Sequence, residues 1–137
     1  MYYFRKENKY TKSKKEKQFI EELLESKKNI YESVKGQKIL SVITKKYGAP
    51  KAVYPISWFP SQGCEHYCLL IDGEYLVYLE VDNETQKVDD IEREKVTINQ
   101  PGKSEKRNYI AVAIGLSKDE IAKLNIVDRG GVEKNKQ

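Results

Sequence analysis

The sequence predicts an α+β protein in which two N-terminal helices pack on an antiparallel β-meander sheet and a short C-terminal helix follows. Apolar residues recur near the helical period of 3.6 in the first third of the chain. In the middle, β-rich runs separated by turn signals replace that period. Helices followed by a strand meander are typical of α+β proteins, and 137 residues is the usual size of one domain.

The first helix is predicted to begin at Ser13, because residues 13–16 (Ser-Lys-Lys-Glu) have the form of a capping box. Apolar residues then follow at helical spacing, and Gly36 can end the helix in the left-handed conformation. These residues are Phe19, Ile20, Leu23, Leu24, Tyr31 and Val34. A shorter helix over 39–47 should end at Gly48 and Pro50, since proline disfavours helix in the residue before it.

A β-hairpin is predicted around Asp72-Gly73. This dipeptide favours a type I′ turn, and it lies between two β-rich runs, residues 67–71 and 74–81. Two further strands are predicted at 96–98 and 107–114. The second is apolar almost without interruption, which is typical of a central strand covered on both faces.

The C-terminal part is predicted to be a short helix followed by a tail. Residues 117–120 (Ser-Lys-Asp-Glu) form another capping box, and the helix should run through Leu124. The polar end after Gly130-Gly131 has nothing to bury. We therefore expect an N-terminal arm (1–12), a single domain (13–126) and a flexible tail (127–137).

The composition favours a cytoplasmic protein without a membrane partner. Residues 1–10 hold no apolar segment of the kind a signal peptide needs, and the longest apolar runs are too short to span a bilayer. Cys64 and Cys68 would lie roughly 13 Å apart along an extended strand, too far for a disulfide. Reduced thiols are the simpler expectation.

Charge is divided unevenly along the chain. The net charge is +4, but residues 1–18 carry +5 and residues 52–100 carry −7. The acidic part has no EF-hand order, and the simplest interpretation is a solvated rim; the alternative is a docking surface for a basic protein. The acidic residues in question are Asp82, Glu84, Asp89, Asp90, Glu92 and Glu94.

The N-terminal arm is the candidate nucleic-acid-binding segment. It interleaves aromatic rings, which stack on bases, with cations, which neutralise phosphates. The candidate residues are Tyr2, Tyr3, Phe4, Arg5, Lys6, Lys9, Tyr10, Lys12, Lys14 and Lys15. The competing interpretation is a disordered, solubilising tail.

Trp58 and Phe59 are the candidate protein-binding residues. Pro55 and Pro60 flank them, so this stretch cannot continue a central strand and should lie on a loop or a sheet edge. Tryptophan and phenylalanine are enriched at the centres of interfaces. Capping one end of the core is the alternative role.

Cys64, His66 and Cys68 alternate along a predicted strand and therefore share one face. A structural zinc site needs four ligands, and no other Cys or His is present to complete it. A Cys nucleophile with a His base requires contact at about 3 Å, whereas neighbours two apart on a strand lie roughly 6 to 7 Å apart at Cβ. We expect no metal, with Cys68 packed in the core.

No nucleotide-binding or hydrolase motif occurs, so neither a cofactor nor a catalytic residue is expected. The first hypothesis is a non-enzymatic binding protein that engages nucleic acid or a nucleoprotein, as a phage or mobile-element inhibitor of a host nucleoprotein would. The second is an inhibitor or immunity-type protein that binds a protein partner through its acidic face. The third is a small enzyme that uses a cysteine with His66.

Overall fold

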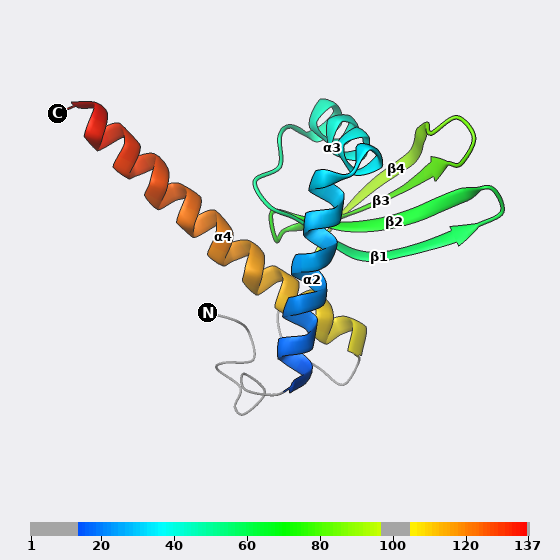
Figure 1. The fold of residues 1–137 in the computed structure, drawn as a ribbon, viewed down its shortest axis with the longest axis horizontal. Helices are drawn as coiled ribbons and strands as arrows, with labels where there is room; N and C mark the ends of the chain where they lie inside the picture. Colours follow the sequence, from blue (N-terminus) through cyan, green and yellow to red (C-terminus); the bar gives the residue numbers. More distant parts are fainter. Residues whose placement is uncertain (1–13, 97–104, 137) are drawn as a thin grey trace.

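The computed structural model describes residues 14–96 and 105–136, with side chains described for 16–96 and 107–124 (Figure 1). Its elements are α2 (Lys14–Glu32), α3 (Val34–Tyr47), β1 (Val53–Ser61), β2 (Cys64–Ile71), β3 (Tyr75–Asp82), β4 (Val88–Lys95) and α4 (Glu105–Lys136). The predicted α+β layout is confirmed: two helices, a four-stranded antiparallel sheet in the order β1-β2-β3-β4, and a C-terminal helix.

The two N-terminal helices meet at a corner that lies earlier than predicted. Ser33 has an extended backbone and caps α3, accepting a hydrogen bond from the Gly36 amide at 2.9 Å. Gly36 therefore lies inside α3 and does not end α2. A Cβ atom there would overlap the main chain of Ile30, so only glycine permits this approach of the helices. The expected end of the second helix at Gly48 is confirmed.

The predicted hairpin joins β2 and β3. Asp72 and Gly73 both have positive φ angles, 55° and 69°, and the Glu74 amide donates to the Ile71 carbonyl at 3.0 Å. This combination is a type I′ turn. The two strands pair from Ile71 opposite Tyr75 onwards.

Strand β1 lies at one edge of the sheet, which confirms the placement expected from its prolines. A bulge between Pro55 and Ser57 interrupts its pairing with β2. An edge strand tolerates proline because its outer N–H groups have no neighbouring strand to pair with.

Strand β4 was not predicted from the sequence. The predicted strand at 96–98 begins at Val96, which follows β4, and its remaining residues lie outside the described ones. Strand β4 has one residue more than β3 at the point where its pairing shifts, opposite Tyr78 and Glu80. Asp90, which lies in this bulge, has a φ angle of 52°. This bulge brings Val88 and Ile91, three residues apart, against the same hydrophobic cluster and breaks the period of two.

The prediction of a strand over residues 107–114 is wrong, because this segment belongs to α4. Residues from Ile110 to Ile114 are all buried, as expected, but in a helix that contacts α2, β1 and β2. The prediction of a capping box at residues 117–120 is also wrong. Ser117 is buried in mid-helix and donates to the Ala113 carbonyl at 2.8 Å. The helix is longer than predicted and continues to Lys136, through the predicted tail.

Two hydrophobic clusters lie on opposite faces of the sheet. Helix α4 and the first part of α2 cover Tyr54, Cys68, Leu70 and Leu76 on one face. Helix α3 covers the other face, where Leu69 and its neighbours pack. Figure 1 shows the strands extending to one side of α2 while α4 runs away from the sheet on the other. Among the described residues, no helix is both long and apolar enough to cross a membrane.

Candidate functional site

The face of the sheet that packs against α2 and α4 is covered at only one end. Along β2, Leu70 and Cys68 are buried on this face, whereas His66 and Cys64 are partly exposed. On the edge strand β1, Phe59 is 54% exposed. The helices therefore leave the end of the face near the β1–β2 turn open to solvent.

This open end contains a hollow of about 440 Å³, which we name the acidic hollow. Three phenylalanine or tyrosine residues and three carboxylates contribute to its lining, and none of its lining residues is lysine or arginine. The residues that define it are Phe59, Tyr78, Glu80, Asp90 and Glu92. The hollow is therefore a concave, negatively charged surface with an apolar component.

The other four carboxylates of the predicted acidic rim lie on β4 or where β3 turns toward it. Asp89 and Glu94 are exposed on this edge strand, and Glu94 accepts a hydrogen bond from the Tyr78 hydroxyl at 2.8 Å. Burial and this hydrogen bond raise the pKa of Tyr78 above its usual value. Asp82 has a structural role, because it accepts hydrogen bonds from the amides of Glu84 and Thr85 in the β3–β4 turn.

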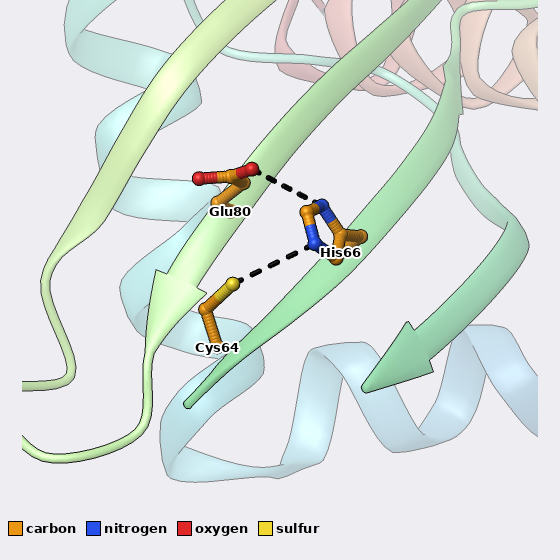
Figure 2. A group of neighbouring side chains, drawn as sticks. All are labelled: Cys64, His66 and Glu80. Carbon is orange, nitrogen blue, oxygen red and sulfur yellow. Dashed lines mark hydrogen bonds and ion pairs between the residues drawn. The ribbon is translucent and has the colours of Figure 1, made fainter. Parts of the chain in front are cut away.

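Cys64, His66 and Glu80 form a group of contacting side chains at the border of the acidic hollow (Figure 2). The Cys64 sulfur lies 3.6 Å from Nε2 of His66, and Nδ1 of His66 lies 3.2 Å from Oε1 of Glu80. The Phe59 ring stacks on the imidazole with a centroid distance of 4.6 Å. The imidazole is thus held between a thiol and a carboxylate.

Strand pairing explains this arrangement. Cys64 and His66 share a face of β2 because they are two residues apart, and their side chains lean together into contact. Glu80 lies directly opposite His66 in the β2–β3 register. Cys68, which the alternation also placed on this face, is buried and is not one of the three grouped side chains. The sequence prediction missed Glu80, whose position depends on the register of the hairpin.

The group has the order of a thiol, a base and an orienting acid found in catalytic triads. Its electrostatics oppose that chemistry. Desolvation, together with the carboxylates of Glu80, Asp82 and Asp90, raises the pKa of the Cys64 thiol. Reactive cysteines have positive surroundings that favour the thiolate. The carboxylates around Cys64 therefore disfavour the thiolate form that a cysteine nucleophile needs.

Trp58 and Phe59, predicted as one protein-binding pair, lie on opposite faces of β1. The indole N–H of Trp58 donates to Glu65 Oε1 at 3.0 Å, and Tyr67 donates to the same oxygen at 2.8 Å. Lys35 of α3 donates to Oε2 of this carboxylate at 2.7 Å. Trp58, Glu65, Tyr67 and Lys35 also line a second cavity, of about 430 Å³, between the helix corner and the sheet.

We expect Glu65 to make stability depend on pH. The hydrogen bond from Lys35, followed by those from Tyr67 and Trp58, lowers the Glu65 pKa from its ordinary 4.5 to about 2. A lowered pKa means that this stabilisation is complete above pH 4.5 and is lost as the pH falls toward 2. Glu65→Gln should lower the free energy of unfolding by about 1 kcal/mol at neutral pH, after allowance for solvent screening.

Urea unfolding of both proteins at neutral pH and near pH 2 measures this difference, which should shrink in acid. Glu84→Gln, in an exposed turn, is the matched control and should change stability by less than about 0.5 kcal/mol. A Glu65→Gln difference that is the same at both pH values would contradict the assignment.

The candidate arm residues from Tyr2 to Lys12 lie outside the described residues, and Lys14 and Lys15 open α2. Their predicted role in nucleic-acid binding stays a prediction. Comparison of the chain with known protein families, curated protein sequences and solved structures finds no significant match.

Proposed function

We propose that this is a non-enzymatic binding protein whose acidic hollow takes a lysine- or arginine-rich segment of a protein partner. The observation that carries the proposal is the gathering of Glu80, Asp90 and Glu92 beside aromatic rings on an uncovered sheet face. Carboxylates attract a basic segment and orient it, while Phe59 and Tyr78 offer ring faces for its alkyl stems and cations.

The partner that fits the whole chain best is the protein component of a nucleoprotein complex. The basic aromatic arm supplies a second surface, on which nucleic acid would bind through phosphate neutralisation and base stacking. The division of charge along the chain supports this arrangement. Residues 1–18 carry a net charge of +5, which suits a negatively charged partner, and residues 52–100 carry −7, which suits a positively charged one. An inhibitor that acts through the acidic hollow alone is the second candidate.

The protein-binding part of the proposal is tested by titrating a fluorescent lysine-rich peptide with the full-length protein. The double variant Asp90→Asn, Glu92→Gln should weaken binding by about tenfold, since each exposed charge pair contributes up to about 1 kcal/mol. Asparagine is chosen at position 90 because it tolerates the positive φ angle of this residue.

The matched control removes two exposed carboxylates from α2, with Glu21→Gln and Glu25→Gln. It has the same net charge as the test variant and should bind the peptide like the unmodified protein. Equal losses in both variants would mean that peptide binding follows net charge alone, which contradicts a defined site.

The nucleic-acid half is tested with a fluorescent single-stranded oligonucleotide and a protein that lacks residues 1–12. Removal of the arm should weaken binding steeply, and added salt should weaken the binding of the full-length protein. Peptide binding without any oligonucleotide binding would favour the inhibitor that uses the hollow alone.

A further inference from the structure

We propose that Cys64, His66 and Glu80 form a binding site for one zinc ion, with water in the fourth coordination position. The three residues each offer one donor atom, and these atoms all lie within 4.8 Å of one another. The three donors are a thiol sulfur, an imidazole nitrogen and a carboxylate oxygen, which are the donor types that bind zinc in proteins. The site goes beyond the proposed binding function and does not depend on it.

The distance between two of the three donors suits a tetrahedral ion. Zinc bonds of about 2.3 Å to sulfur and 2.0 Å to nitrogen place these two donors roughly 3.5 Å apart at a tetrahedral angle. The observed separation of the Cys64 sulfur and Nε2 of His66 is 3.6 Å. Glu80 has a side chain that is 35% exposed, so its carboxylate can rotate toward the same point.

The surroundings hold the imidazole in place and attract a cation. Phe59 stacks on the His66 ring, with an angle of 16° between the two planes, and so restricts its rotation. The carboxylates of Glu80 and Asp90 both line the adjoining acidic hollow. Their negative charge stabilises a bound divalent ion.

The donor set also selects among metals. Magnesium and calcium prefer sites made entirely of oxygen donors, whereas sulfur and imidazole nitrogen favour zinc and its neighbours. Three protein ligands with one open position is the pattern of zinc sites that exchange a water molecule for another ligand.

The test is calorimetric titration of the reduced, full-length protein with zinc alone, together with the absorption spectrum of its cobalt(II) form. We expect one zinc ion per chain and a cobalt spectrum with a thiolate charge-transfer band. Cys64→Ser and His66→Gln should each weaken zinc binding by more than about 100-fold, because loss of a supporting residue alone costs 10–100-fold at zinc sites.

The matched control is Cys68→Ala, which removes the other thiol of the chain from the same face. It should keep zinc affinity and the cobalt band, and circular dichroism checks that each variant is folded. The proposal is overturned if the unmodified protein takes up no stoichiometric zinc, or if Cys64→Ser binds zinc as tightly as the unmodified protein. The zinc titration contains no peptide, so its result does not decide the outcome of the peptide-binding experiment.

Discussion

Replacing Gly36 by alanine should lower the free energy of unfolding by about 3 kcal/mol. The added Cβ atom would overlap the carbonyl group of Ile30, and that group belongs to the main chain, so the α2–α3 corner must shift to accept it. Helix propensity alone predicts the opposite sign, since alanine in a helix is better than glycine by about 1 kcal/mol. The sign of the change, measured by urea unfolding, therefore tests the corner directly.

Ser41→Ala provides the control for this substitution. Ser41 is exposed on the same helix, so the change should leave stability unaltered or raise it by about 0.5 kcal/mol. If Gly36→Ala raised stability as this control does, the close approach between the start of α3 and Ile30 would be refuted.

Ile114→Ala is the second substitution with a large expected effect, a loss of about 3 kcal/mol. Ile114 is 2% exposed and belongs to the cluster that α4 forms with α2 and the sheet. Its truncation removes buried apolar surface and leaves a cavity among side chains from three elements. Thermal and urea unfolding both report the loss.

Lys123→Ala is the control within the same helix, because Lys123 is exposed and should contribute less than about 0.5 kcal/mol. A cost of less than about 1 kcal/mol for Ile114→Ala would contradict the packing of α4 against the sheet.

The part of the fold that could be predicted is the part encoded locally. Asp72 and Gly73 determine the hairpin because their positive φ angles are a property of the turn itself. Pro55 and Pro60 likewise exclude a central strand and leave a loop or an edge strand, since proline removes a hydrogen-bond donor wherever the strand lies. Such signals need no knowledge of distant residues.

The segment 107–114 could not be assigned in this way, because a fully buried apolar run has no polar face to reveal its period. Its helical state follows from what surrounds it, namely α2 on one side and the sheet on the other. The helix start predicted at Ser117 was wrong for a related reason. A serine that caps a helix and a serine that donates to the carbonyl four residues earlier, as Ser117 does to Ala113, have the same local sequence pattern.

The candidate site depends on the register of strands β2 and β3, and a shift of one residue would abolish it. Glu80 lies opposite His66 because Ile71 pairs with Tyr75 rather than with Glu74. A shift by one residue would place Leu79 there and turn Glu80 to the other face. The sequence prediction included the alternation of Cys64 and His66, but it did not define the register that adds the carboxylate.

Trp58 gives the molecule an optical reporter of its own. It is the single tryptophan of the chain, it is 55% exposed, and its indole is bonded to Glu65 beside the cavity at the helix corner. Fluorescence excited selectively in tryptophan therefore arises from one known position. Protonation of Glu65 or entry of a small molecule into that cavity should shift the emission, whereas a ligand confined to the acidic hollow lies across the sheet from the indole. Emission spectra can thus distinguish events on the two faces without any added label.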